Sequence, residues 1–306
     1  MIEGDVIIVD GIPDSEYDLL IEECVKYAII SLPFTVDRMS ITNEKKRALN
    51  IAKGKIAEAL FEIFCRKNNI NIDFDICTTP FWTVDNRDFV LNGNEWDIKN
   101  NFIYCQSEYF NGNYTDLPGL VPNRYNGDQW SKRNENLIAG TNGVCFLFTY
   151  LKNADLINGQ RGNEFLEIDI SPNQQSFIRE LYKKYGGKPQ QFEPFTSQWF
   201  WESMAQKGNS NYFRLNFRPH LIITGYANET HWSMFEDTGP FDRSNNFQIY
   251  TKPRWYLKSQ KGSCNFLNGT LWTTITNATT PISNLPSFSS LYPTLRTSIK
   301  AGRFRG

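Results

Sequence analysis

Hydrophobic residues in the first part of the chain recur every three or four positions, which is the spacing of one face of an α-helix. One such stretch covers about residues 14–31, and Pro33 is expected to end it because proline lacks the backbone N–H that a helix needs. A longer stretch runs from about Thr42, expected as its N-cap, to Lys67. The pattern therefore predicts two amphipathic helices.

After the second helix the pattern changes to alternation of polar and apolar residues, which is typical of β-strands. Residues 70–76 alternate cleanly and predict one strand. Residues 88–91 and 96–99 predict two more, and the Asn-Gly-Asn sequence at 92–94 favours a hairpin turn between them. The nearly continuous apolar run at 143–150 predicts a buried central strand.

The second half of the chain continues with both patterns. A weaker helical pattern covers about 127–137, and 165–170 predicts a strand. A helix is expected over 171–185, because Ser-Pro is a typical helix start, and 220–226 predicts another strand. The last sixty or so residues are rich in Asn, Ser, Thr and Pro and give no clear pattern. The order of elements predicts an α/β fold in which helices flank a mixed central β-sheet.

Composition narrows the class of protein. The 306 residues are 40% hydrophobic, which supports a sizeable core and excludes disorder, collagen and coiled coil. No apolar run approaches the roughly 20 residues that span a bilayer, so we expect no membrane partner. The N-terminus is acidic and lacks a signal-peptide pattern, so a cytoplasmic, prokaryotic-type protein is expected. Only two histidines are present, which disfavours His-rich metal sites and most His-based catalysis, and the six scattered cysteines contain no CxxC pair.

The charges are sorted along the chain although the net charge is only −1. Asp242 is the last acidic residue, and nine basic residues follow it. The preceding part contains 23 basic and 33 acidic residues. This sorting is compatible with a polyanionic partner for the C-terminal part, while a basic, solvated tail is the simpler alternative.

The predicted hairpin carries the candidate chemistry. Asp97 and Lys99 stand two apart on one strand, so their side chains project from one face, and Asp88 enters from the partner strand. Neighbouring carboxylates repel each other unless a cation joins them, and hard oxygen ligands suit Mg²⁺. The backbone carbonyl of Ile98 is a further candidate ligand. Lys99 could orient or deprotonate a water and offset charge on a transferring phosphorus.

These residues fall into a longer series. Residues 55–58 (Lys-Ile-Ala-Glu), 88–93 (Asp-Phe-Val-Leu-Asn-Gly) and 95–99 (Glu-Trp-Asp-Ile-Lys) occur in that order. The series resembles the PD-(D/E)XK nuclease superfamily, whose layout is a Glu-bearing helix, a strand, a hairpin with Asp and then (D/E)-x-Lys, a helix and a strand. The resemblance covers roughly residues 42–152.

Matched residue by residue, Glu58 takes the place of the helix acid, Asp88 and Asp97 those of the hairpin acids, and Lys99 that of the lysine. Arg87 stands where the family usually has proline. The resemblance implies a restriction-endonuclease-like core in which the three acids and the backbone carbonyl of the residue before the lysine hold Mg²⁺, with Mn²⁺ as a substitute. It implies a metal-dependent endodeoxyribonuclease, most similar to the type II restriction kind.

The same residues have simpler interpretations. Glu58 could be an ordinary helix-surface partner of Lys55, and Asp97 with Lys99 could be solvated on an exposed hairpin. Glu95 shares the strand face of Asp97 and is a rival second acid. We prefer Asp97 because only it stands two residues before a lysine. The alternative function is a non-catalytic nucleic-acid or carbohydrate binding module on a degenerate nuclease scaffold, and the intact set of four residues argues against it.

The predicted nuclease divides into an N-terminal helical segment (1–41), the catalytic core (42–152) and a C-terminal extension (153–306) that could recognise DNA. Double-stranded DNA is the expected partner, and a homodimer is expected by analogy with enzymes that cut palindromes. Candidate DNA contacts are polar or basic residues of the core and of the basic C-terminal part: Asn100, Gln129, Lys132, Arg254, Lys258, Arg303 and Arg305.

Overall fold

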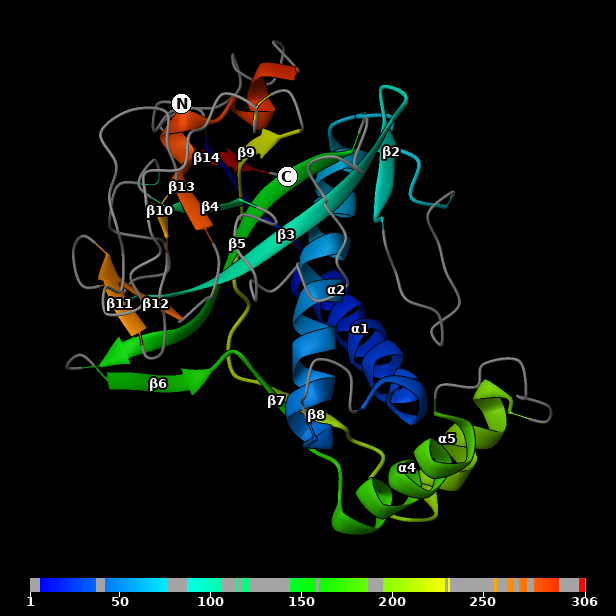
Figure 1. Cartoon of the computed structure of the whole chain (residues 1–306). Helices are drawn as coiled ribbons and strands as arrows, with labels where there is room; N and C mark the ends of the chain where they lie inside the picture. Colours follow the sequence, from blue (N-terminus) through cyan, green and yellow to red (C-terminus); the bar gives the residue numbers. More distant parts are fainter. Residues whose placement is uncertain are drawn as a thin grey trace.

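The central element of the fold is a mixed, curled β-sheet flanked by helices, so the predicted α/β class is confirmed (Figure 1). This is seen in a computed structural model. It describes residues 6–36, 42–75, 87–105, 114, 117–121, 144–157, 160–186, 195–228, 231, 256–257, 263–266, 270–273, 278–291 and 303–305.

The two longest strands, β3 and β5, run parallel to each other in the middle of the sheet. β9 is antiparallel to β5 and to β1, and β14 is parallel to β1. The order across the sheet is β11 (Ser263–Phe266), β12 (Thr270–Thr273), β3 (Asn94–Tyr104), β5 (Cys145–Ile157), β9 (Leu221–Ala227), β1 (Ile7–Asp10) and β14 (Arg303–Arg305).

Short strands complete the edges and form two smaller sheets. β2 (Phe89–Leu91) pairs with β3, and β6 (Gln160–Glu164) pairs with β5. The smaller sheets contain β10 (Tyr256–Leu257), β13 (Ala278–Pro281) and β4 (Pro118–Val121) in one, and β7 (Leu166–Ile168) with β8 (Phe213–Leu215) in the other. Two 3₁₀ turns follow β13, at Ile282–Asn284 and Phe288–Leu291.

Helices α1 (Asp14–Thr35) and α2 (Glu44–Lys67) lie side by side against one face of the sheet (Figure 1). Apolar side chains of both helices form one core with alternate residues of the strands, including Trp96, Leu147 and Ile223. The residues that alternate with these along each strand, such as Phe146 and Phe148 on either side of Leu147, therefore point to the opposite face of the sheet. That face is covered in part by Gly119 of β4, where an added Cβ would lie 3.6 Å from Phe148.

The prediction that Pro33 ends the first helix is wrong, because α1 continues to Thr35. The last turns of α1 are buried, so leaving the helix there would strand backbone groups away from water. The turns remain paired despite the missing N–H: the Thr35 hydroxyl donates to the Ser31 carbonyl at 2.9 Å, and the Val36 N–H donates to the Leu32 carbonyl at 3.0 Å. Burial thus outweighs the local cost of proline.

The second helix begins one residue later than predicted, at Glu44, with Asn43 rather than Thr42 as its N-cap. The Asn43 side chain accepts a hydrogen bond from the Lys46 N–H at 2.8 Å. Asparagine and threonine are both favoured at the N-cap, so the local sequence does not decide which of these two adjacent residues caps the helix. The predicted end of this helix at Lys67 is confirmed.

The strand predicted at 70–76 is wrong for its described part, 70–75, where the only pairing is a single bridge between Asp73 and Val90. The Asp73 carboxylate accepts a hydrogen bond from the Asp75 N–H at 3.0 Å, which makes a local turn. Such side-chain turns compete with strand pairing. The alternation that suggested a strand therefore belongs to a short, mostly irregular segment.

The predicted hairpin is confirmed. Asn92 and Gly93 have φ values of 53° and 76°, so both central residues adopt the left-handed conformation of a two-residue type I′ turn. This turn fixes the register in which Phe89 faces Trp96 and Leu91 faces Asn94. The register matters because it determines which side chains of β3 lie beside the start of β2.

The predicted helix after Ser171 is also confirmed as α4 (Pro172–Tyr185). The Ser171 hydroxyl accepts from the Gln174 N–H, and the Gln174 side chain accepts from the Ser171 N–H, so a complete capping box starts the helix. α4 packs beside α5 (Ser197–Ala205), away from β10 and β13 (Figure 1). The helix predicted at 127–137 lies outside the described residues.

The central sheet takes strands from all three predicted segments (1–41, 42–152 and 153–306), and β5 runs across the boundary between residues 152 and 153. Among the described residues, no helix is both long enough and apolar enough to cross a bilayer.

Candidate active site

The start of β2 brings Asp88 against β3. The Asp88 N–H donates to the Trp96 carbonyl at 2.9 Å, one step beyond the last regular pair of the hairpin. The Asp88 carboxylate accepts a hydrogen bond from the Ile98 N–H, with 2.5 Å between Oδ2 and N. Asp88 is therefore fixed beside the backbone between Asp97 and Lys99.

Asp97 and Lys99 share a face of β3, as predicted for residues two apart on a strand. Their neighbours Trp96 and Ile98 pack with the α2 core, so the acidic and basic side chains project from the face opposite α2. The Lys99 ammonium lies 5.6 Å from the ring centroid of Phe146, which belongs to that same opposite face.

Glu58 approaches from α2. It stands one turn before Phe61, whose ring lies 5.1 Å from that of Phe89. Because Phe89 follows Asp88 directly, this aromatic contact brings the Glu58 side of α2 close to the start of β2. Glu58 and Asp97 thus come from two different layers of the fold, and Asp88 lies at the sheet edge between them.

The electrostatics of Asp88 report this arrangement. The pKa of the Asp88 carboxyl is raised well above its usual value. The main cause is that protein surrounds the carboxyl group, although the residue keeps some surface exposure. The nearby negative charges of Glu58 and Asp97 raise the pKa further. The hydrogen bond from Ile98 and the charge of Lys55 oppose the rise in pKa. Glu58 and Asp97 therefore each lie within electrostatic reach of Asp88.

Two ammonium groups compensate this negative charge. The Lys55 Nζ lies 2.5 Å from the Glu58 Oε2, and the Lys99 Nζ lies 2.5 Å from the Asp97 Oδ2. All four side chains are only 17–25% exposed, so they are not solvated surface residues. The helix-surface pairing of Glu58 with Lys55 does occur, but in a partly buried position next to Asp88.

The rival acid Glu95 points elsewhere. Its carboxylate pairs with Arg87 at 3.0 Å and its side chain is 58% exposed. Arg87, which stands at the family's proline position, thus holds Glu95 on the hairpin surface. Asp97 rather than Glu95 is the β3 acid whose charge acts on Asp88.

The predicted DNA contacts are described only in part. The Asn100 Oδ1 accepts a hydrogen bond from the Thr149 hydroxyl at 3.1 Å, and its Nδ2 is buried without a hydrogen-bond partner. Arg303 and Arg305 lie on the edge strand β14 and face Ile8 and Asp10 of β1 in the strand register. The remaining predicted contacts lie outside the described residues: Gln129, Lys132, Arg254 and Lys258.

The donor chemistry fits a hard divalent cation, since three carboxylates and the adjoining backbone of Ile98 are oxygen-rich ligands. Among the described residues, however, no three His, Cys, Asp or Glu side chains already stand in a ligating arrangement. Glu58 and Asp97 are instead each paired with an ammonium group. Metal binding by these acids would have to replace at least one of those contacts.

A second buried charge, the ammonium of Lys53, was not predicted from the sequence. The Lys53 ammonium lies 2.5 Å from the Glu164 carboxylate and 5.3 Å from the Phe102 ring centroid, and its side chain is 5% exposed. Burial lowers the pKa of Lys53, and Glu164 opposes this. The only signal in the sequence is that Lys53 follows Ala52 within the apolar stripe of the helix. This pair ties α2 to β6.

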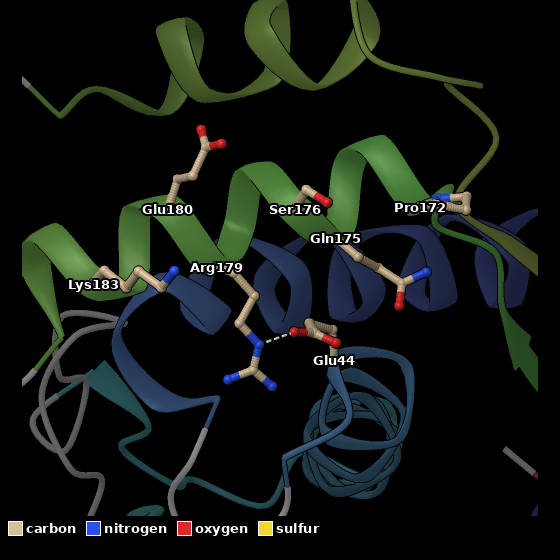
Figure 2. A pocket seen from close by; sticks show the side chains of 7 residues that line it. All are labelled: Glu44, Pro172, Gln175, Ser176, Arg179, Glu180 and Lys183. Carbon is tan, nitrogen blue, oxygen red and sulfur yellow. Dashed lines mark hydrogen bonds and ion pairs between the residues drawn. The ribbon is translucent and has the colours of Figure 1, made fainter.

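A cavity of about 610 Å³ lies along α4, away from the hairpin acids. Figure 2 shows Arg179 of α4 directed at Glu44, the first residue of α2, while Glu180 points away from it. Arg179 also donates to the Thr42 carbonyl. These contacts join α4 to the start of α2, so Arg179 and Glu44, which line the cavity, have a structural role.

Comparison with known proteins gives no relative: no family model, no curated protein and no solved structure matches the chain. The functional conclusion therefore depends on the chemistry of the site.

Proposed function

We propose that the protein is a Mg²⁺-dependent endodeoxyribonuclease of the type II restriction kind, which hydrolyses phosphodiester bonds of double-stranded DNA. The observation that carries the proposal is the position of Asp88 between Glu58 and Asp97, with Lys99 paired to Asp97. These are the four residues that the PD-(D/E)XK resemblance assigns to catalysis.

Glu58, Asp88, Asp97 and the backbone carbonyl of Ile98 would hold Mg²⁺, with Mn²⁺ as a substitute. The ion, when bound, would supply a water of lowered pKa and stabilise negative charge on the phosphate oxygens. The Asp88 carboxylate is already held in position for this role, because one of its oxygens accepts a hydrogen bond from the Ile98 N–H of β3.

Lys99 would orient the attacking water and stabilise charge on the scissile phosphate. Its ammonium is anchored between Asp97 and the face of Phe146, which restricts the long side chain to the neighbourhood of the acids. Positioning and charge stabilisation of this kind supply most of the catalysis in phosphoryl transfer.

The proposed assembly is a homodimer on DNA. A two-fold dimer matches the symmetry of a palindromic site and brings one set of acids to each strand. The basic residues after Asp242 would supply phosphate contacts, since the part of the chain before that point is acidic.

The proposal is tested by incubating a supercoiled plasmid with the protein in Mg²⁺ or in EDTA. Nicked and linear products in Mg²⁺ alone are expected. A gel-shift titration of a duplex in Ca²⁺ runs in parallel, because Ca²⁺ often supports binding without turnover. DNA binding without cleavage in Mg²⁺ or Mn²⁺ would reject the enzyme and favour a binding module on a degenerate scaffold.

A further inference from the structure

Lys55 lies between α1 and the carboxylates of the candidate site. Its ammonium contacts Glu58 at 2.5 Å and lies 5.5 Å from the ring centroid of Tyr27 on α1. Its charge also acts on Asp88. Lys55 is thus a fixed positive charge beside two of the three acids, and the resemblance to nucleases gives it no role.

The surroundings separate this pair from an ordinary helix-surface ion pair. In α1, Lys26 pairs with Glu22 at the same 2.5 Å, but those side chains are 48% and 46% exposed. The side chains of Lys55 and Glu58 are only 24% and 25% exposed. Water compensates for a lost partner at the first pair much better than at the second.

A divalent cation and an ammonium group compete for the same carboxylate oxygens. In the metal-free protein, neighbouring carboxylates repel each other unless positive charges lie close to them. The ammonium groups of Lys55 and Lys99 supply these positive charges. Lys99 has a proposed catalytic task, whereas Lys55 is on the helix side of the cluster, where its ammonium contacts the helix acid Glu58.

We propose that Lys55 is a displaceable counter-ion of the metal site: it holds Glu58 in the metal-free protein and releases it when a divalent cation binds. This inference rests on the proposed function, because it takes Glu58 and Asp88 as metal ligands. It follows that metal affinity is set partly by the cost of breaking the contact between Lys55 and Glu58.

The experiment titrates the DNA-free protein with Ca²⁺ by calorimetry and follows its melting temperature. Lys55→Gln is expected to bind Ca²⁺ about tenfold more tightly than the wild type and to melt at a lower temperature without metal. Its Ca²⁺-induced rise in melting temperature should be larger, because tighter binding to the folded state stabilises it more. Lys55→Arg keeps the charge and should stay within about threefold of the wild type.

Lys26→Gln is the matched control, since it breaks an exposed lysine–glutamate pair of the same length, and its Ca²⁺ affinity should be unchanged. Equal or weaker Ca²⁺ binding by Lys55→Gln would overturn the inference while leaving the nuclease proposal intact. Absence of Ca²⁺ and Mn²⁺ binding in every variant would overturn both. If Lys55→Gln is unfolded without metal, refolding on addition of Ca²⁺ supports the inference and failure to refold contradicts it.

Discussion

At the scale of single residues, the central feature is a carboxylate that is costly to ionise. Asp88 is surrounded by protein and lies near Glu58 and Asp97, so its pKa is raised. Perturbed pKa values of this kind cluster at functional sites, and they also occur in structural ion-pair networks. The hydrogen bond from Ile98 keeps this carboxylate ordered in spite of the cost.

Asp88→Asn is therefore expected to stabilise the metal-free protein at neutral pH by about 1 kcal/mol, or a rise of roughly 1–2 °C in melting temperature. An amide oxygen can still accept from Ile98. A raised pKa in the folded state means that stability is lost as pH rises through it, so the advantage of asparagine should vanish at acidic pH, where Asp88 is itself protonated. Thermal unfolding over a pH series checks this.

Glu95→Gln provides the comparison, because it removes a carboxylate from an exposed pair with Arg87. Its effect should be small. A lower melting temperature for Asp88→Asn at neutral pH would show that the negative charge of Asp88 is favourable in the metal-free protein and would contradict this account of the cluster.

The buried pair of Lys53 and Glu164 gives a second prediction. Glu164→Gln leaves a buried ammonium without its counter-charge and should destabilise the protein by about 2 kcal/mol. Lys53→Met replaces the charge by an apolar side chain of similar length and leaves a carboxylate that reaches solvent, so it should remain within about 1 kcal/mol of the wild type. Urea unfolding of the two variants measures the difference, and equal losses would show that the pair acts through packing alone.

At the scale of elements, the site depends on how the hairpin meets α2. The turn at Asn92 and Gly93 sets the register that fixes Asp88 beside β3, and the contact between Phe61 and Phe89 brings Glu58 to the same place. Distortion of the turn should therefore reach the site without altering any of its side chains.

Gly93→Ala and Gly54→Ala form a matched pair for testing the role of backbone conformation. A Cβ at either position meets no atom within 4 Å. Gly93 has a φ of 76°, so alanine there should cost about 1 kcal/mol or more. Gly54 lies inside α2, where alanine should stabilise by roughly 0.5–1 kcal/mol. Chemical denaturation should give opposite signs, and the same sign for both would contradict the assigned turn geometry.

Much of the element order could be predicted from the sequence because its signals are local. The I′ turn, the capping box at Ser171 and the apolar run that begins β5 are each encoded within a few residues. The misses are non-local: burial carries α1 through Pro33, and an aspartate turn replaces the strand expected at 70–75. The strands after residue 255 pair with distant partners such as β3 and β1, which local alternation does not reveal.

The candidate site shows the same limit. The spacing of Asp97 and Lys99 predicts their common face, and the turn predicts that Asp88 joins them. The burial of Lys55 against Tyr27 depends on how α1 packs against α2, and no periodicity in the sequence contains that information. The spacing of Lys55 and Glu58 suggested their pairing, but for the same reason it could not show that the pair is partly buried beside Asp88.

At the scale of the whole molecule, acidic and basic parts of the chain meet in one sheet. β14, from the basic C-terminal part, lies beside β1 and forms an edge of the central sheet. The candidate site acids lie on β3, its hairpin and α2, so one folded unit joins an acidic site and a basic chain end, as the proposed DNA-cutting function requires.

Replacement of Arg303 and Arg305 by glutamine should weaken DNA binding and reduce its salt dependence. If both residues contact phosphates, the slope of log affinity against log salt should fall by about 1.8, since each contact contributes about 0.9. Fluorescence anisotropy of a labelled duplex in Ca²⁺ at several salt concentrations measures the slope. An unchanged slope would remove β14 from the proposed DNA contacts.

The most direct test of the catalytic proposal is the single-turnover rate of Mg²⁺-dependent DNA cleavage by the wild type and three variants. Asp97→Ala and Lys99→Ala should lose activity by about 10²-fold or more, because each removes a group proposed to act on the reacting phosphate. Glu95→Ala, which removes an exposed acid from the same strand face, should stay within about threefold of the wild type. Cleavage that survives both Asp97→Ala and Lys99→Ala, or a wild type that cuts no DNA in Mg²⁺ or Mn²⁺, would contradict the proposed nuclease site.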